Sequence, residues 1–512
     1  MSGGLSDVEN QVSLDHKPLP FFYETERARR AQQSWAELPL RARLECTRGF
    51  RHALADATRR VCSVVAAELG KHYDEILVGD ILPVVEQCRF LELHARRILR
   101  PRRTSLLTRP VILWGQRDWT YRRPRGVVGV IGTWNLPLSI NAVPIMHALV
   151  AGNGVLFKPS ELAPKTGELL ADLIAQAGFP ADIFQLLPAH RDAGPQLAEA
   201  DIDHIAFTGS STTGRALAAT LGRRLVTSTL ELSGCDSLVL LDDGDVSLAA
   251  RGAWFGATAN LGQACVATRR AFVPRTMLDE FLGILGPLVE QASPVTLLLP
   301  AQVELAERLV ADAQERGARL IRRDAGSPTN GLVQPAALIQ SSPDTLACQE
   351  AFFVPLLTVI PYDSIDQAIA WNAQCPYFLG ASVFTRDIEK ALALSGKLRS
   401  GVVHVNDVIL PMAQPATCFG GRGASGWGRT KGVEGLLDMT VPQVVSAVSG
   451  RSRPHFDAPG TFWLFDPIAF EALIRLRHAR SLCGKLRGAR RLIGKLLSPY
   501  QAGRSDCFGD ED

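Results

Sequence analysis

The stretch that decides the fold opens with Glu231-Leu232-Ser233-Gly234 and closes with Gly262-Gln263-Ala264-Cys265-Val266-Ala267-Thr268-Arg269. The opening places a carboxylate and small residues at the end of an apolar run, and the closing sets a cysteine among small residues. A carboxylate and a thiol are a candidate general base and nucleophile. A lone cysteine is more often a small buried hydrophobic residue, so the pair gains meaning only from the sequence around it.

Other short motifs precede and follow this stretch. They are Trp134-Asn135-Leu136-Pro137, Lys158-Pro159-Ser160-Glu161 and Phe207-Thr208-Gly209-Ser210-Ser211-Thr212-Thr213-Gly214 upstream, and Asn406 and Phe419-Gly420-Gly421 downstream. Together, and in this order, the motifs resemble the aldehyde dehydrogenase superfamily over roughly residues 22–445, in its NAD(P)-dependent, non-acylating form. The resemblance implies an α/β protein with two Rossmann-type parallel-sheet domains and a small oligomerisation β-arm. It also implies a homodimer or homotetramer that oxidises an aldehyde to its acid.

The bulk composition is that of a globular protein. With 46% hydrophobic and 21% charged residues, the 512-residue chain has room for two or three domains. Its net charge of +3 gives no overall field that would favour nucleic acid. The ten cysteines show no zinc-site spacing, so we expect no metal, and reduced thiols in the cytoplasm. Residues 1–20 lack a signal-peptide core and are expected to be disordered, and no apolar run is long enough to span a membrane.

Apolar periodicity divides the rest of the chain. Residues 22–100 show helical spacing, which predicts two or three helices, one of them running through Leu44, Phe50, Leu54 and Val61. From Gly126, short β-rich runs alternate with helical segments, first to residue 232 and again from 237 to 405, which is typical of parallel α/β sheets. With the resemblance, the expected organisation is a cofactor-binding domain (21–109 and 125–232), a catalytic domain (233–437) and an oligomerisation arm (110–124 and 438–450).

Residues 451–512 form an extension beyond the resemblance. Between Phe470 and Leu497, apolar residues recur at helical spacing, and eight Arg or Lys residues stand against Glu471 alone, a net charge of +7. A basic amphipathic helix of this kind is typical of segments that bind membrane surfaces. A helix docked on the protein body with a solvated basic face fits the same pattern. Gly484, Gly488 and Gly494 weaken any helix there.

The resemblance assigns the catalytic roles to three residues. It implies that Cys265 attacks the aldehyde carbon, that Asn135 stabilises the resulting oxyanion, and that Glu231 activates the water that hydrolyses the thioester. It further implies a cofactor-binding set, which consists of Trp134, Lys158, Ser160, Glu161, Gly209, Ser210, Leu232 and Phe353. The cofactor is NAD or NADP, and the Glu161 carboxylate favours NAD because it would repel a 2′-phosphate. Aromatic or medium-to-long aliphatic aldehydes fit the small net charge and the tail.

The sequence departs from the family motifs at three places. Ala351 stands where a glutamate usually holds the nicotinamide ribose, and Val354 replaces a glycine of the same motif. Ser233 replaces a glycine after the base, and Cys235 stands where a longer polar side chain is common. Two alternatives therefore stay open: a divergent relative with weakened cofactor binding and a binding or assembly role, and an enzyme that forms acyl-coenzyme A. The presence of Glu231 argues against the second.

Overall fold

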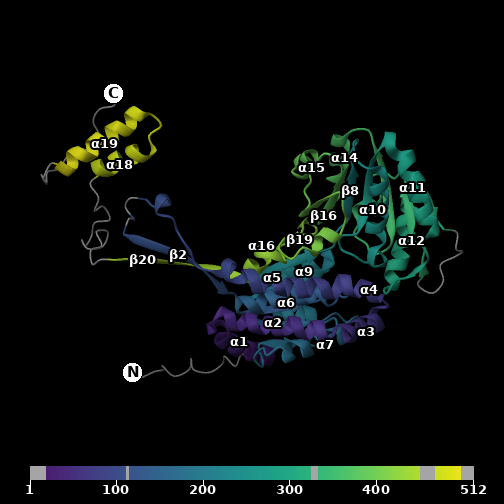
Figure 1. Cartoon of the computed structure of the whole chain (residues 1–512), viewed down its shortest axis with the longest axis horizontal. Helices are drawn as coiled ribbons and strands as arrows, with labels where there is room; N and C mark the ends of the chain where they lie inside the picture. The colour runs from purple at the N-terminus through teal and green to yellow at the C-terminus, as the bar shows by residue number, and fades with distance from the viewer. Residues whose placement is uncertain (1–18, 111–112, 114, 324–331, 450–466, 498–512) are drawn as a thin grey trace, which may run out of the picture. The chain divides into compact units, whose positions relative to one another are not determined.

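The computed structural model describes residues 19–110, 113, 115–323, 332–449 and 467–497. They belong to two compact units, one built from the chain up to Arg102 together with Thr120–Val444, and the other from Arg103–Trp119 together with the chain from Val445 onward (Figure 1). The expected disorder of residues 1–20 falls almost wholly outside the described residues.

The first sheet of the larger unit has the strand order β19-β7-β6-β3-β4-β5. The bounds are Gly426–Trp427 (β19), Thr227–Leu232 (β7), His204–Gly209 (β6), Val127–Ile131 (β3), Gly154–Lys158 (β4) and Phe184–Leu186 (β5). The five strands from β7 to β5 pair in parallel, and β19 is antiparallel to β7. Every residue of β3 and β4 is buried, as expected for parallel strands covered on both faces.

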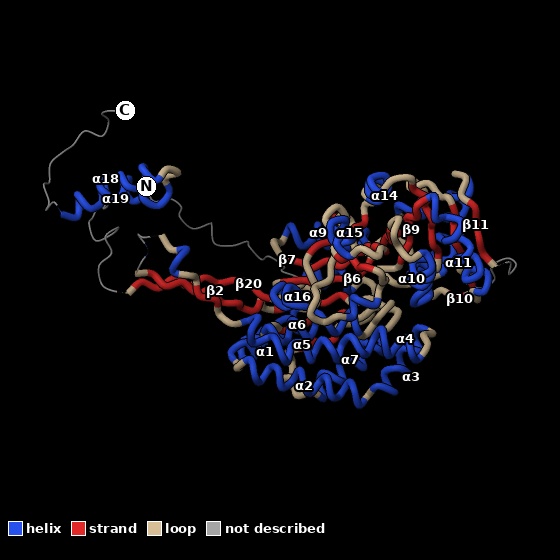
Figure 2. The backbone as a smooth tube through the Cα atoms, turned by 45° about the horizontal axis from the view of Figure 1, so that its top comes forward, coloured by secondary structure: helices blue, strands red, loops and turns tan. Residues whose placement is uncertain are grey.

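Helices cover both faces of this sheet (Figure 2). Their bounds are Phe22–Glu37 (α1), Leu40–Asp56 (α2), Thr58–Leu69 (α3), Tyr73–Ile76 (α4), Leu82–Leu99 (α5), Ser139–Ala151 (α6), Pro164–Gln176 (α7), Ala193–Glu199 (α8), Ser211–Arg223 (α9) and Gly432–Asp438 (α16). One apolar core joins α2, α3, α5, α6 and α7 to β3 and β4, and a second core joins α8 and α9 to the other face.

The N-terminal helices correct one expectation from the sequence. Residues 22–100 hold five α-helices rather than two or three, and the single helix expected through Leu44 and Val61 is broken between α2 and α3. The break occurs because Ala57 has φ −86° and ψ 7°, outside helical geometry. Leu54 and Val61 are both fully buried, so the apolar spacing continues across the break and conceals it.

The second sheet has the strand order β11-β13-β14-β9-β8-β16-β17. The strands are Arg319–Arg322 (β11), Ala336–Ile339 (β13), Leu356–Tyr362 (β14), Thr268–Pro274 (β9), Asp236–Leu240 (β8), Gly380–Phe384 (β16) and Val402–Val405 (β17). All neighbours are parallel except β11 and β13. Helices α10 (Val246–Thr258) and α11 (Leu278–Gln291) pack on one face, and α14 (Ile365–Asn372) and α15 (Ile388–Ser395) on the other, while α12 (Pro300–Glu315) packs near β13. The expectation of two parallel-sheet domains is confirmed.

The arm and the tail contain further strands and helices. Strands β1 (Arg102–Arg103), β2 (Gln116–Pro124) and β20 (Thr440–Val448) form a three-stranded sheet. The expected single basic helix is instead a pair, α18 (Pro467–His478) and α19 (Leu482–Leu497). No helix in the described part of the chain is long and apolar enough to cross a bilayer.

Candidate active site

The predicted cofactor residues follow the carboxyl ends of adjacent strands of the first sheet. Trp134 comes shortly after β3, Lys158 ends β4, Gly209 ends β6 and Leu232 ends β7. Because the strands are parallel, these ends meet at one edge of the sheet, where ligands bind in doubly wound folds.

A lysine and a carboxylate lie together after β4. The Nζ atom of the buried Lys158 is 3.1 Å from Glu161 Oε2, and the other oxygen of Glu161 accepts a hydrogen bond from Arg191 at 3.2 Å. Partial burial acts to raise the pKa of Glu161, but hydrogen bonds from the backbone, Lys158 and Arg191 lower it overall. Ser160, also buried, accepts a hydrogen bond from the backbone of Leu162. An ammonium beside a carboxylate suits the paired hydroxyls of a ribose.

The start of α9 offers a site for an anion. Ser210 is the N-cap residue of this helix, and its hydroxyl oxygen accepts a hydrogen bond from the backbone N–H of Thr213 at 3.2 Å. The helix begins directly after β6, so its first N–H groups and its dipole favour an anionic group at the same edge of the sheet. A pyrophosphate fits this position.

The aromatic residues predicted to contact the cofactor meet across two segments. The rings of Trp134 and Phe353 are 5.8 Å apart in an edge-to-face arrangement. The backbone N–H of Phe353 donates to Gln302 Oε1 of α12 at 2.9 Å, which fixes the loop. Ala351 carries no carboxylate for a ribose, and the preceding Glu350 has an extended backbone. The residues present therefore fit the adenosine half of a dinucleotide better than its nicotinamide half.

The loop before Cys265 has an unusual backbone. Asn260, Leu261 and Gly262 have φ values of 54°, 59° and 73°, a left-handed region that residues other than glycine seldom adopt. Fully buried Arg269 holds the loop, because its guanidinium donates to the carbonyl oxygens of Gly262, Phe352 and Val354 at 2.5, 2.7 and 2.5 Å. Arg269 thereby ties the cysteine loop to the loop that carries Phe353.

Asn135 lies beside the same loop. Its Nδ2 donates to the carbonyl oxygen of Gln263 at 3.0 Å, and its Oδ1 accepts from the hydroxyl of Thr133 at 3.0 Å. Asn260 donates to the backbone carbonyl of Asn135 at 3.1 Å. An amide nitrogen has two N–H groups, and the hydrogen bond to Gln263 uses one of them.

The thiol of Cys265 has a raised pKa. Burial raises its pKa to about 12, with further contributions from the carboxylates of Asp236 and Glu231. Only the thiolate is an effective nucleophile, so Cys265 has to lose its proton before it can attack a carbonyl carbon.

Glu231 supplies a buried carboxyl group whose pKa is also raised. Its Oε1 accepts a hydrogen bond from Thr430 at 3.4 Å, and its buried Oε2 has no hydrogen-bond partner among the described residues. Burial raises the pKa of Glu231 to about 8, against the lowering effect of Arg429, Thr430 and Lys431. Glu231, Thr430 and Asn141 line a small cavity of about 10 Å³. This volume is roughly what one water molecule needs.

Sequence reasoning missed the cations next to Glu231. An ideal Cβ on Gly420 would lie 3.0 Å from both Glu231 Oε1 and an Arg429 guanidinium nitrogen, so the two groups are close. Lys431 lies over the ring of Phe419 and donates to the carbonyl of Met412. Burial lowers the pKa of Lys431 to about 8, while Glu231, Cys418 and Cys265 act to raise it. In the sequence, these cations could have been noticed as two basic residues, Arg429 and Lys431, shortly after the Gly420-Gly421 motif.

The surroundings of Cys265 are apolar. Cys265 packs against a cluster of Ala264, Val266, Ala267 and Leu379, and Ile409, Met412 and Phe419 pack against the same cluster. No group of three or more His, Cys, Asp or Glu side chains in the described ranges could hold a metal ion. The site therefore combines an apolar approach with one thiol, one carboxyl group and one amide.

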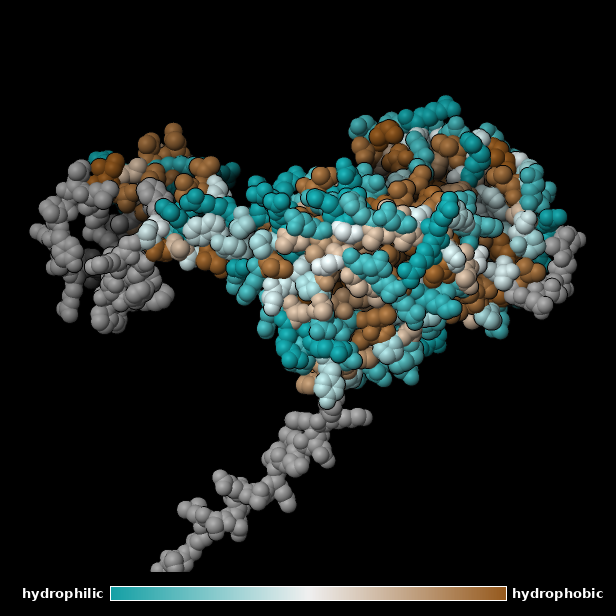
Figure 3. Space-filling model, turned by 60° about the horizontal axis from the view of Figure 1, so that its bottom comes forward, coloured by the Kyte–Doolittle hydropathy of each residue, from teal (hydrophilic) through white to brown (hydrophobic). Residues whose placement is uncertain are grey.

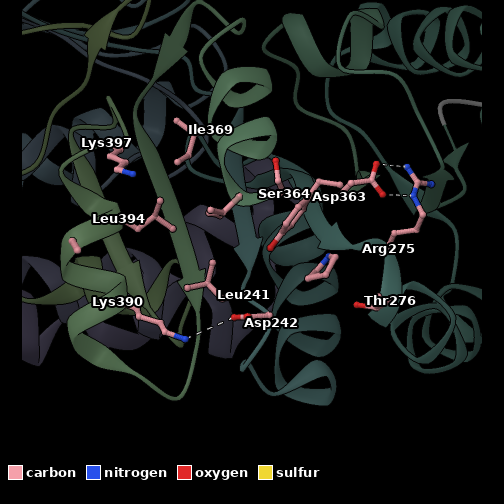
Figure 4. Close-up of a pocket in the computed structure, with 14 residues that line it drawn as sticks. Leu241, Asp242, Arg275, Thr276, Asp363, Ser364, Ile369, Lys390, Leu394 and Lys397 are labelled. Atoms are coloured by element: carbon pink, nitrogen blue, oxygen red, sulfur yellow. Dashed lines mark hydrogen bonds and ion pairs between the residues drawn. The ribbon is translucent and has the colours of Figure 1, made fainter.

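A larger cavity of about 610 Å³ lies elsewhere in the second sheet (Figure 4). It opens at the carboxyl ends of β8, β9 and β14, between α14 and α15, whereas Cys265 precedes the amino end of β9. Its charged residues pair with each other, Arg275 with Asp363 at 2.7 Å and Lys390 with Asp242 at 3.9 Å. This cavity is separate from the candidate active site.

Known proteins resemble this chain over most of its length. The sequence profile of the aldehyde dehydrogenase family matches residues 23–445. The chain is 34% identical over 448 residues to a 4,4'-diapolycopene aldehyde oxidase from Methylomonas sp., covering 85% of this chain and 83% of the relative. It is 29% identical over 451 residues to a putative NADP(+) succinate-semialdehyde dehydrogenase from Mycolicibacterium smegmatis, covering 85% and 86% of the two chains.

Solved structures give the same result. An aldehyde dehydrogenase from Mycobacterium tuberculosis in complex with NAD+ superposes with a TM-score of 0.77 at 28% identity, covering 83% of this chain and 89% of that one. A putative aldehyde dehydrogenase from Burkholderia cenocepacia superposes with a TM-score of 0.78 at 27% identity, covering 85% and 91%. The chain therefore belongs to the aldehyde dehydrogenase family and is an oxidoreductase that oxidises an aldehyde to its acid.

Proposed function

We propose that the chain oxidises an apolar aldehyde with NAD through a thiohemiacetal and then a thioester on Cys265. The observation that carries this proposal is the convergence of Asn135 and Glu231 on the Cys265 loop. This convergence lies in the same compact unit as the sheet edge where Lys158 and Ser210 stand.

The first step is addition to the aldehyde. Cys265 loses its proton to solvent, and its sulfur forms a bond to the carbonyl carbon. The carbonyl oxygen becomes an oxyanion, which accepts hydrogen bonds from the second Nδ2–H of Asn135 and the backbone N–H of Cys265. Removing one such donor typically costs roughly 2.7–4 kcal/mol of transition-state stabilisation.

The second half of the reaction forms and hydrolyses the thioester. NAD, when bound, supplies the acceptor for the hydride that leaves the former aldehyde carbon. The carbon then remains bound to Cys265 as a thioester. Glu231 takes a proton from a water molecule, the water oxygen bonds to the carbonyl carbon, and the carbon–sulfur bond breaks. The leaving thiolate takes this proton from Glu231, so the products are the carboxylic acid, the free thiol and the Glu231 carboxylate.

The choice of NAD over NADP rests on Glu161. Its carboxylate is held by Lys158 and Arg191 at the position expected for the adenosine ribose, and it would repel a 2′-phosphate. The Mycobacterium tuberculosis neighbour was solved with NAD+, while the Mycolicibacterium relative is named for NADP(+). The holding residues are Trp134, Lys158, Ser160, Glu161, Gly209, Ser210, Leu232 and Phe353.

The substrate class follows from the side chains around the thiol. Ile409, Met412 and Phe419 pack against the same apolar cluster as Cys265, and they favour an aromatic or medium-to-long aliphatic aldehyde. The Methylomonas relative is named for a diapolycopene aldehyde, which supports the same class.

The proposal extends to assembly and location. The arm at 110–124 and 438–450 would join subunits of a homodimer or homotetramer. Residues 21–109 with 125–232 would form the cofactor-binding domain, and residues 233–437 the catalytic domain. The described cysteines form no disulfide, which supports a reducing, cytoplasmic setting. Contact with a membrane surface is argued from the tail below.

Absorbance of reduced nicotinamide tests the proposal. The protein would be mixed with NAD or NADP and a panel of apolar aldehydes, beside Cys265→Ala and a matched Cys46→Ala control. We expect a signal with NAD that Cys265→Ala abolishes and Cys46→Ala retains. A rate that depends on added coenzyme A would favour the acylating alternative. No signal and no NAD binding by any variant would favour the binding or assembly role.

A further inference from the structure

The two C-terminal helices form a closely packed hairpin. An ideal Cβ on Gly488 of α19 would lie 2.6 Å from both the carbonyl oxygen of Ala472 and the backbone nitrogen of Leu476 in α18, so only glycine permits this approach. Glu471 of α18 forms an ion pair with Arg491 of α19 at 3.5 Å. The sequence marked Gly488 as a residue that weakens the helix, whereas the structure uses it as the contact point between two helices.

The hairpin leaves an apolar stripe in contact with solvent. Leu482, Leu486 and Ile493 of α19 are 75%, 60% and 55% exposed. At about 100° per residue these three side chains lie within about 40° of one another around the helix. Figure 3 shows apolar residues (brown) beside hydrophilic ones (teal) on the second unit, at the left of the view. A soluble domain rarely keeps such a stripe without a partner.

A short turn in the same unit adds to the apolar surface. Leu106 and Leu107 are 69% and 90% exposed. The guanidinium of Arg477 in α18 donates to the carbonyl oxygens of Arg109 at 2.9 Å and of Leu107 at 3.5 Å. The turn therefore lies against α18 of the hairpin, and it adds two exposed leucines to the same unit.

Positive charge flanks the stripe. Residues 467–497 carry eight Arg or Lys and one Glu, a net charge of +7 in a chain whose total is +3. Around α19, Lys485 and Arg490 lie on opposite sides of Leu482, at about 60° and 80° from it. Both are exposed, and neither forms an ion pair with a described residue. Long basic side chains beside an apolar stripe can reach lipid phosphates while the stripe enters the acyl region.

We propose that this hairpin docks on an anionic lipid surface, with α19 parallel to the membrane plane and Leu482, Leu486 and Ile493 entering the acyl boundary. The helices, of 12 and 16 residues, are shorter than the roughly 20 residues that span a bilayer, so the hairpin lies on the membrane. Nucleic acid would pair with the positive charge but would not bury the apolar stripe, so it fits the hairpin less well than a lipid surface. A second copy of the hairpin would bring two charges of +7 together. The proposal is independent of the catalytic role of Cys265.

Co-sedimentation of the full-length protein with vesicles tests this proposal. Neutral phosphatidylcholine vesicles would be compared with vesicles of about 30% phosphatidylglycerol. One variant combines Leu482→Ser, Leu486→Ser and Ile493→Ser, and a second combines Lys485→Gln with Arg490→Gln. Leu225→Ser is the matched control, because Leu225 is 92% exposed and lies in the larger unit. Circular dichroism and aldehyde oxidation in vesicle-free solution check that each variant is folded.

We expect the wild-type protein and Leu225→Ser to sediment with the anionic vesicles and to dissociate in about 0.5 M salt. The charge variant should bind roughly thirtyfold more weakly, since each cation near an anionic surface contributes about a factor of five. The serine variant should lose binding to the same or a greater extent. Failure of the wild-type protein to sediment, or equal sedimentation of the serine variant, would overturn the proposal. The proposal would also be overturned if the only change in the serine variant were a smaller oligomer, because the stripe would then be a contact between copies of the chain. Preferential binding of the wild-type protein to polyuridylate would overturn it as well, because the basic side chains would then bind nucleic acid.

Discussion

The pH dependence of thioester hydrolysis is the sharpest test of the role of Glu231. The pKa of this carboxyl group is raised to about 8 by burial, so it is the proton-bound form that dominates at neutral pH. About one tenth of Glu231 is ionised at pH 7 and about nine tenths at pH 9. Because only the carboxylate can accept a proton from water, hydrolysis of the thioester should accelerate by about tenfold between these pH values and then reach a plateau.

The assay is single-turnover hydrolysis of the acylated enzyme, followed by acid quench and intact mass measurement. In Glu231→Gln the acyl group should persist, with hydrolysis slower by roughly 10²–10⁴-fold, whereas the exposed Glu389→Gln should behave as the wild type. A wild-type rate that stays flat from pH 6.5 to pH 9 would refute the reasoning. So would a rate that rises tenfold per pH unit without a plateau, because that is the signature of hydroxide attack without a general base.

Three further perturbations address the oxyanion, the cofactor and the fold. Asn135→Ala should lower kcat/KM by roughly 10²–10³-fold because one oxyanion donor is lost; a steady-state rate within threefold of wild type would argue against this role. Glu161→Ser should raise the ratio of kcat/KM with NADP to that with NAD by roughly tenfold or more, since a like charge near the 2′-phosphate is removed; an unchanged ratio would place the ribose elsewhere. Asp80→Asn should lower the free energy of unfolding by roughly 3–5 kcal/mol, measured in urea, because it leaves the ammonium of buried Lys71, 3.1 Å from Asp80, without its charge partner; a loss below about 1 kcal/mol would show that the pair is solvated.

Much of the first domain could be predicted from the sequence. The alternation of β-rich runs and helical segments expected from Gly126 onward is present, for example in β3 (Val127–Ile131) and α6 (Ser139–Ala151), because continuous apolar runs and glycine boundaries mark these elements clearly. Strand β9 was missed, since it begins Thr268-Arg269-Arg270 and reads as part of the cysteine loop. Its two arginines are buried because carbonyl oxygens satisfy them, as in the 2.8 Å hydrogen bond from Arg270 to Cys235. Such compensation depends on tertiary contacts that a local pattern does not contain.

The candidate site divides in a similar way. Cys265, Glu231 and Asn135 stand in recognisable motifs, so their grouping could be expected. Lys431 could not, because it comes near Glu231 only when β19 folds back antiparallel to β7, which aligns Gly426 with Glu231. The hairpin was concealed for the opposite reason, since the apolar spacing of the tail continues through the turn between α18 and α19.

The central claim is that Cys265 carries the acyl group, and peptide mapping tests it most directly. Glu231→Gln would be incubated with NAD and an apolar aldehyde, quenched in acid and digested, and each cysteine peptide would be weighed. We expect the mass of one acyl group on the peptide that contains Cys265, formed in step with one equivalent of reduced cofactor. An acyl group on another cysteine peptide, or reduced cofactor formed with no acyl group on any cysteine, would contradict it.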